Sequence, residues 1–140
     1  DLQLMLKTYK QIHNQAEAVV VEGAGGFLVP LNATENLSDL AAELHLPIIM
    51  VVGMRLGCIN HALLTEEAIK SRDLKLAGWV ANSLSSEMPY LEENIKYLNS
   101  KLNAPLLGVI PPLPEALQKP IHAPYSIDAL QYAAQHLSLP

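Results

Sequence analysis

Apolar residues recur along the chain in two patterns, and the order of these patterns predicts the fold. Spacings of three and four residues predict helices, whereas short apolar runs bounded by Gly, Pro or polar residues predict buried strands. Helical spacing covers residues 2–16, 37–44, 60–72, 91–102 and 126–137. Apolar runs cover residues 18–22, 47–53, 75–82 and 105–111.

Helices and strands alternate in this prediction from one end of the chain to the other. Alternation of helices with strands that are apolar throughout predicts a parallel sheet with helices on both faces. The predicted fold class is therefore α/β. A chain of 140 residues fits one domain, and no composition shift marks an internal boundary within residues 1–140.

Polar residues, Gly and Pro follow all four predicted strands. The segments that follow them are EGAGG, GMRLGCIN, NSLSSE and PPLPEALQ. In open sheets of this class, ligands bind outside the carboxyl ends of the strands. The sequence therefore predicts a ligand site at that edge.

Composition narrows the classes of function. A formal net charge of −5 argues against duplex nucleic acid as the main partner, which would require a basic face. No apolar run reaches the roughly 18 residues of a membrane-spanning helix, so no membrane association is expected. A single cysteine, Cys58, excludes an internal disulfide framework and favours a reducing compartment such as the cytoplasm.

Glu22 ends the first predicted strand and is followed by glycines at positions 23, 25 and 26. A carboxylate in this position is typical of an acid that binds Mg²⁺ beside nucleotide phosphates, and the glycines let a substrate approach the backbone. A solvated glutamate and a tight turn explain the same residues equally well. The loop lacks the lysine and hydroxyl residue of a phosphate-binding P-loop.

The segment GCINH, residues 57–61, lies between a predicted strand and a predicted helix. Free amides at a helix N-terminus can bind a carboxylate or a phosphate. The alternatives are that Asn60 caps the helix and that Cys58 is a small buried apolar residue. A nucleophilic Cys58 is disfavoured because no neighbouring residue supplies a base. His61 is interpreted as a surface or packing residue.

Asn82 ends the third predicted strand, and the segment PPL, residues 111–113, comes at the end of the fourth. An amide side chain can donate to and accept from an adenine edge at once, and prolines can fix a loop against a flat base. A turn and a stiffened loop are the alternative interpretations.

Taken in order, the motifs VVVEGAGGFLVPL, LPIIMVVGMRLGCINHALLT, LAGWVAN and APLLGVIPPL resemble dethiobiotin synthetase, the ATP-dependent cyclo-ligase of biotin biosynthesis. The resemblance extends from about Glu17 to Leu113. It implies part of a P-loop NTPase-like fold and a homodimer. It also implies closure of the ureido ring of dethiobiotin from 7,8-diaminononanoate and CO₂, with ATP as cosubstrate and Mg²⁺ as cofactor.

The resemblance also implies roles for individual residues. Glu22 corresponds to the Mg²⁺ ligand. The residues implied to lie beside the nucleotide are Glu22, Gly23, Ala24, Gly25, Asn82, Ser83, Pro111, Pro112 and Leu113. The residues implied to hold the carboxylate tail of the substrate across a dimer interface are Gly57, Cys58 and Asn60.

The chain departs from the family at the Walker A motif, GxxxxGK[ST], which it does not contain. Lys7 and Thr8 have no glycines before them and lie in a helical stripe. The resemblance therefore places no catalytic residue in this chain. It implies a C-terminal part of a single P-loop-type domain that is inactive alone.

Two alternatives remain open. One is a partitioning-type or cobyric-acid-synthase-like ATPase, against which GCINH argues because neither enzyme needs a site for a diamine tail. The other is a non-catalytic scaffold or dimerisation module with the same fold.

Overall fold

The computed structural model describes residues 1–138, which belong to two compact units. One unit comprises Asp1–Pro47 and Glu67–Lys75, and the other comprises Ile48–Glu66 and the chain from Leu76 onward. No helix within the described residues is both long and apolar enough to span a membrane.

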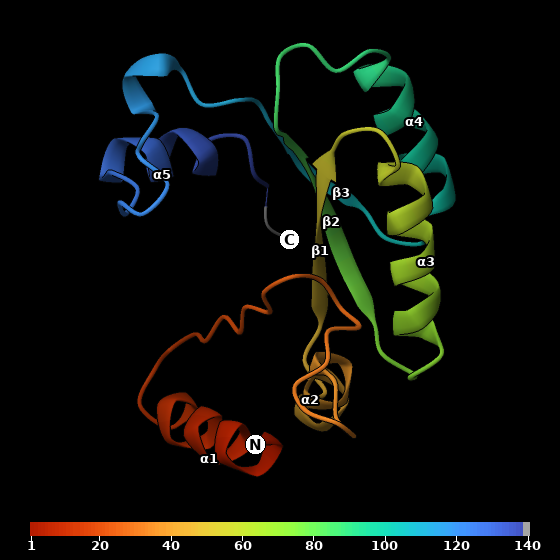
Figure 1. Ribbon diagram of the computed structural model, residues 1–140, viewed down its shortest axis with the longest axis vertical. Coiled ribbons are helices and arrows are strands. Elements are labelled where there is room, and N and C mark those ends of the chain that lie inside the picture. Colours follow the sequence, from red (N-terminus) through yellow and green to blue (C-terminus); the bar gives the residue numbers. More distant parts are fainter. Residues whose placement is uncertain (139–140) are drawn as a thin grey trace. The chain divides into compact units, whose positions relative to one another are not determined.

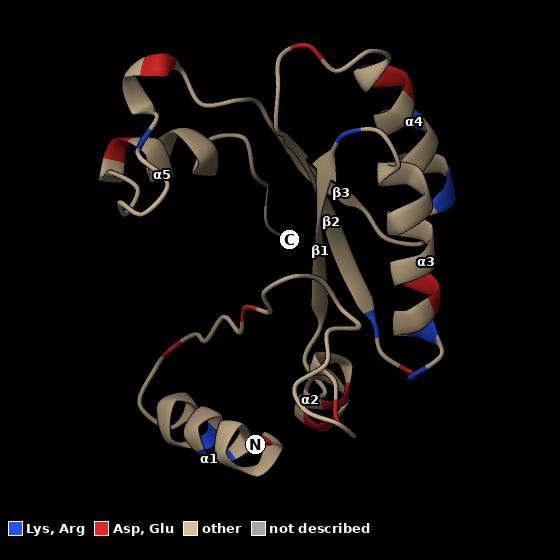
Figure 2. Ribbon diagram, viewed as in Figure 1, with Lys and Arg blue, Asp and Glu red and all other residues tan. Residues whose placement is uncertain are grey.

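A three-stranded parallel sheet forms the centre of the second unit (Figure 1). Its strands, in spatial order, are β1 (Ile48–Met54), β2 (Leu76–Ser83) and β3 (Leu106–Ile110). These strands carry no Lys, Arg, Asp or Glu, as Figure 2 shows, which suits strands that pack within a protein interior. The predicted parallel α/β architecture is confirmed.

Helices connect the strands and cover the sheet. α3 (Cys58–Lys70) follows β1, and α4 (Leu91–Lys101) follows β2. Connections between neighbouring parallel strands are right-handed. When successive strands are added in the same direction across a sheet, the connecting helices therefore lie on the same face. In Figure 1, α4 and the first part of α3 accordingly lie on the same side of the sheet, and α5 (Ile127–Ala134) lies on the other.

The core of this unit lies between the sheet and the helices. Along β1, Met50, Val52 and Met54 are buried, as the period of two along a strand requires. Trp79 of β2 and Leu98 of α4 are fully buried. Burial of such side chains contributes about 1.5–3 kcal/mol each.

The chain after α5 returns to the sheet. Leu137 forms an antiparallel bridge with Gly108 of β3, and the Ser138 N–H donates to the Leu107 carbonyl at 2.7 Å. Gly108 is required here because a Cβ at this position would collide with the His136 carbonyl oxygen. This pairing explains why α5 ends at Ala134, earlier than the predicted 137.

The first unit contains α1 (Leu2–His13) and α2 (Leu37–Leu44), which pack against each other. The Asp1 carboxylate caps α1 by accepting from the Gln3 N–H at 2.9 Å. The Asp39 carboxylate accepts from the Asn36 N–H at 2.7 Å and closes the first turn of α2. Local capping thus defines the start of both helices.

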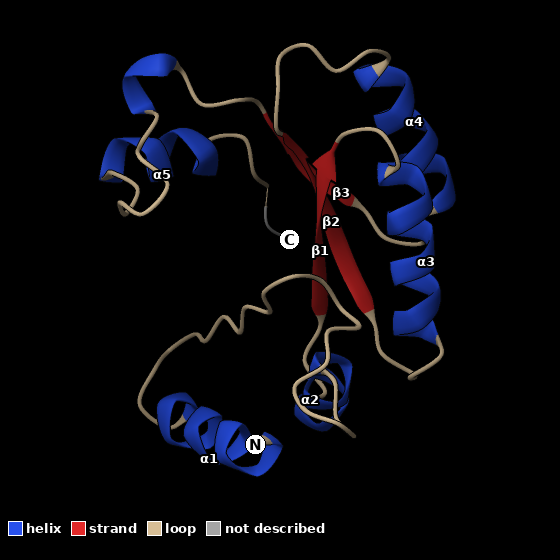
Figure 3. Ribbon diagram, viewed as in Figure 1, coloured by secondary structure: helices blue, strands red, loops and turns tan. Residues whose placement is uncertain are grey.

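The strand predicted at residues 18–22 is wrong. These residues form loop, as the tan segment between α1 and α2 in Figure 3 shows, and the side chain of Val20 is 93% exposed. An apolar run becomes a strand only when a neighbouring strand pairs with it, and none of the described residues pairs with this run. The other eight predicted elements are confirmed, with ends shifted by a few residues.

Replacement of Glu66 tests the packing of α3 against the end of α4. Glu66 is 5% exposed, and its carboxylate accepts from the Asn103 N–H at 2.8 Å. We expect Glu66→Ala to lower the free energy of unfolding by about 1–3 kcal/mol, because it removes a buried side chain and its hydrogen bond to the Asn103 N–H. Urea denaturation measures this loss.

Glu67→Ala is the matched control, because Glu67 is exposed on the same helix. It should change the unfolding free energy by no more than about 0.5 kcal/mol. Equal losses in the two variants would contradict the assigned role of Glu66.

Candidate functional site

The carboxyl ends of the three strands meet at one edge of the sheet in the second unit. Asn82 of β2 pairs in register with Gly53 of β1 and with Ile110 of β3. Asn82 therefore occupies the middle of this edge, and Pro111 follows directly after its partner Ile110. The structure thus brings together the two sequence motifs that were predicted to contact a base.

Ser83 adds an unsatisfied polar group to this edge. The residue is 6% exposed, and its hydroxyl has no hydrogen-bond partner among the described residues. A buried hydroxyl without a partner costs free energy, and the Ser38 hydroxyl and the Trp79 Nε1 share this state, so the feature alone does not indicate a ligand. Asn82 and the three residues 111–113 are half-buried, as a site that contacts a ligand requires.

The segment after β1 leads into the N-terminus of α3. Gly57 has φ = +91°, a conformation that favours glycine, and α3 begins at the next residue. The Cys58 N–H donates to the Arg55 carbonyl at 3.0 Å, which closes this turn. No acidic residue lies in the first turn of α3, so the positive end of its dipole is not neutralised from within the helix.

The structure distinguishes the predicted roles within this segment. Cys58 is 3% exposed, which fits packing rather than nucleophilic chemistry. Asn60 does not cap α3, because the helix begins at Cys58 and Asn60 lies within its first turn with an exposed side chain. Its amide thus faces solvent at the N-terminal end of the helix.

Glu22 and the glycines belong to the first unit. Because residues 18–22 form no strand, the predicted placement of Glu22 at the end of a buried strand is wrong. Glu22 and residues 23–26 are all exposed, and Gly25 and Gly26 have φ values of +86° and +119°. Only glycine adopts such values without strain, so this backbone stays open to a ligand.

Glu22 is the metal ligand that the resemblance implies, and it is a single exposed carboxylate. No group of three or more His, Cys, Asp or Glu residues gathers anywhere in the described chain. Mg²⁺ is commonly held by one or two carboxylates together with waters and substrate phosphates, so one exposed carboxylate beside open backbone is compatible with it.

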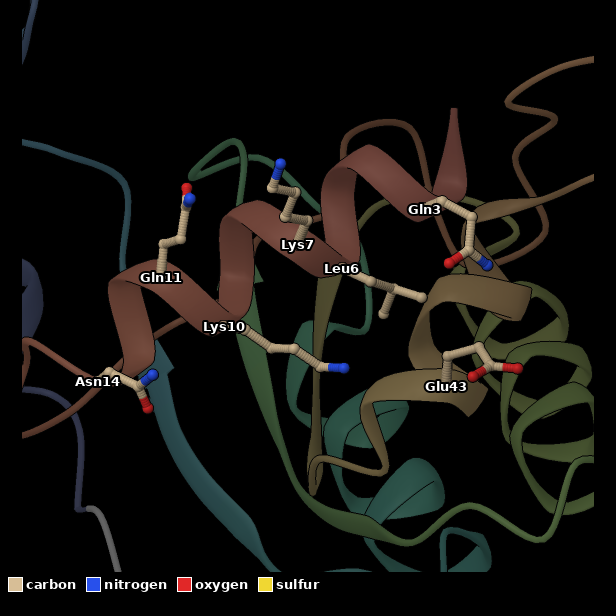
Figure 4. A pocket seen from close by; sticks show the side chains of 7 residues that line it. All are labelled: Gln3, Leu6, Lys7, Lys10, Gln11, Asn14 and Glu43. Atoms are coloured by element: carbon tan, nitrogen blue, oxygen red, sulfur yellow. The ribbon is translucent and has the colours of Figure 1, made fainter.

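A groove between α1 and α2 is a separate feature of the first unit (Figure 4). Its lining residues are Gln3, Leu6, Lys7, Lys10, Gln11, Asn14 and Glu43. None of them was predicted to bind a ligand. Figure 4 shows long polar side chains along one helix face, which is an ordinary solvent-exposed surface.

Sequence reasoning missed two features. One is the unsatisfied hydroxyl of Ser83. The other is a contact between Phe27 and Arg72, in which the guanidinium carbon lies 5.8 Å from the ring centroid. These two residues are distant in the sequence and share no periodic pattern, so no sequence signal connects them.

A parallel sheet of this connectivity, with polar and Gly-rich segments after its strands, is consistent with a P-loop NTPase-like α/β fold. The model of a protein family described as "AAA domain" matches residues 1–119. The chain belongs to this AAA domain family.

Comparison with curated proteins confirms the resemblance to dethiobiotin synthetases. A protein of Janthinobacterium sp. (strain Marseille) named ATP-dependent dethiobiotin synthetase BioD is 55% identical over 120 residues, which cover 83% of this chain and 51% of the relative. The protein of the same name from Cellvibrio japonicus is 61% identical over 99 residues, which cover 71% of this chain and 43% of the relative. The chain therefore spans about half the length of the relatives that it matches.

Thiol labelling tests the packing role of Cys58. Because the side chain is buried, we expect a thiol reagent to label it much more slowly in the native protein than in the chain unfolded by urea. Labelling of the native protein as fast as that of the unfolded chain would identify an accessible, reactive thiol instead.

Proposed function

We propose that this chain is the C-terminal part of an ATP- and Mg²⁺-dependent cyclo-ligase that forms the ureido ring of dethiobiotin. The observation that carries the proposal is 55% identity over 120 residues to a protein named ATP-dependent dethiobiotin synthetase. The substrates would be 7,8-diaminononanoate, CO₂ and ATP. One amine captures CO₂ as a carbamate, ATP phosphorylates the carbamate, and the second amine displaces phosphate to close the ring.

In this proposal the adenine base lies at the carboxyl edge of β2. The Asn82 amide donates to and accepts from the base edge, while Ser83 and the residues 111–113 line its surroundings. The central register position of Asn82 supports this assignment. The half-buried prolines 111 and 112 supply a stiff apolar wall suited to a flat base.

The carboxylate tail of the diamine is assigned to the N-terminus of α3. The positive end of the α3 dipole lies at Gly57 and Cys58, and the exposed Asn60 amide supplies a donor. The Cys58 N–H is already bonded to the Arg55 carbonyl, so Cys58 would contribute through its position and not through that N–H. The absence of an acidic residue from the first helical turn supports an anion here. We propose that this segment serves the partner subunit of a homodimer.

Glu22 is assigned to Mg²⁺, and residues 23–25 to the phosphates and the reacting amines. The bound ion would neutralise charge on the transferring phosphoryl group. The exposed carboxylate and the glycine backbone support this role because they leave both ligands room to approach. A lysine of a Walker A motif is absent from this chain, so we propose that the chain alone does not catalyse the reaction.

Asn82→Ala tests the adenine assignment. We expect the Kd of the complete enzyme for ATP to rise about tenfold, because the variant removes the hydrogen bonds to the base. Inorganic tripolyphosphate is the matched control ligand, since it has phosphates but no base. Calorimetry should give it an unchanged Kd, and an equal loss for both ligands would contradict base recognition by Asn82.

Glu22→Gln tests the metal assignment and the reaction together. The amide keeps the shape of the side chain but removes the charge that Mg²⁺ requires. We expect the complete enzyme to retain its fold and lose most of its diaminononanoate-dependent release of ADP at ordinary Mg²⁺ concentrations. Part of that loss should be recovered at high Mg²⁺.

Glu17→Gln is the control for this experiment, because Glu17 is an exposed glutamate of the same unit. It should leave the Mg²⁺ dependence unchanged. Normal turnover of Glu22→Gln at ordinary Mg²⁺ would show that Glu22 is only a solvated side chain.

A further inference from the structure

Residues 23–37 form a closed loop in the first unit. The Leu37 N–H donates to the Val29 carbonyl at 2.8 Å, and the Leu31 N–H donates to the Glu35 carbonyl at 2.8 Å. A Cβ on Gly23 would lie in ordinary contact with Leu37, at 3.5 Å. The second half of the loop is therefore held by backbone hydrogen bonds.

The glycine-rich half of the loop has fewer restraints. Residues 22–26 are exposed, and the positive φ values of Gly25 and Gly26 lie in a region that glycine enters and leaves easily. Phe27 is the first half-buried side chain after this run. Phe27 is therefore the nearest side chain after the run that packs against the rest of the unit.

Arg72, just beyond α3, contacts the Phe27 ring. Its guanidinium carbon lies 5.8 Å from the centroid of the Phe27 ring, within the range of a cation–π contact. Nη1 of the same side chain donates to the Ala68 carbonyl at 3.0 Å and to the Ser71 hydroxyl at 3.3 Å. These bonds restrict the guanidinium to an orientation from which it can contact the ring.

We infer that Arg72 is a positioning residue for the glycine-rich loop, acting through the Phe27 ring to hold Glu22 and the following backbone in place for the metal and the phosphates. The role toward metal and phosphates rests on the proposed function. Order in the free loop reduces the conformational entropy that is lost when ligands bind. Loss of Arg72 should therefore weaken metal binding more than it slows the reaction at saturating metal.

Nitrogen-15 relaxation of this chain measures the order of the loop without any ligand. We expect the order parameters of Gly25 and Gly26 to be about 0.8 in the wild type and to fall below about 0.6 in Arg72→Ala. Arg72→Lys keeps a cation near the ring and should restore part of the order. Amides of α4 serve as the internal reference and should not change.

Two further variants isolate the ring contact. Ser71→Ala removes the longer of the two hydrogen bonds that orient Arg72 but leaves the Ala68 bond and the ring, so loop order should fall by less than in Arg72→Ala. Phe27→Leu should loosen the loop as Arg72→Ala does, and Arg72→Ala should then add no further effect. Unchanged order parameters in Arg72→Ala, or additive effects of the two substitutions, would overturn the inference.

Kinetics of the complete enzyme test the consequence for the ligands. We expect Arg72→Ala to raise the Mg²⁺ concentration for half-maximal activity about two- to five-fold while kcat at saturating Mg²⁺ stays near wild type. A purely structural role would lower thermal stability and kcat without shifting the Mg²⁺ dependence, and that result would overturn the inference.

A different result would contradict the proposed function. If the wild-type enzyme showed no Mg²⁺-dependent turnover of 7,8-diaminononanoate, the proposed function would be wrong. The relaxation experiment would still decide whether Arg72 orders the loop, because it requires neither substrate nor metal.

Discussion

Parallel pairing of β2 with both of its neighbours is the constraint on which the site in the second unit depends. The register aligns Gly53, Asn82 and Ile110 across the sheet, so three segments that are distant in sequence end at one edge. Crossover connections in parallel sheets share one hand, which places α4 and the start of α3 together on one face. The residues that follow the carboxyl ends of the strands are loop residues.

The two units supply different parts of the proposed chemistry by different physical means. In the second unit, the sheet places the residues that we propose to contact a base, and the positive end of the α3 dipole is proposed to attract an anion. In the first unit, backbone hydrogen bonds hold the second half of the loop, and we infer that the Phe27–Arg72 contact positions the half that carries Glu22. A rigid edge suits recognition of a flat base, whereas an open glycine backbone suits close approach of phosphates.

Most of the fold could be predicted from the sequence, because the spacing of apolar residues indicates which face of a helix or strand is buried. Eight of the predicted elements formed, since each has an apolar face that packs locally or against the sheet. Residues 18–22 did not form a strand, because strand formation depends on a pairing partner that an apolar run cannot specify. α3 begins two residues before the predicted 60, because the positive φ of Gly57 ends the preceding turn at that point.

The candidate site was predictable only in part. Asn82 and residues 111–113 were identified because they follow predicted strands, and parallel strands share one carboxyl edge. The unsatisfied Ser83 hydroxyl and the Phe27–Arg72 contact depend on three-dimensional packing.

The most direct test of the account is an NMR titration of this chain with Mg-ATP. We predict weak binding, with a Kd on the order of 1 mM, and shifts concentrated at Asn82, Ser83 and Leu113. Shifts concentrated instead at the α1–α2 groove, or micromolar binding without a change at Asn82, would contradict it.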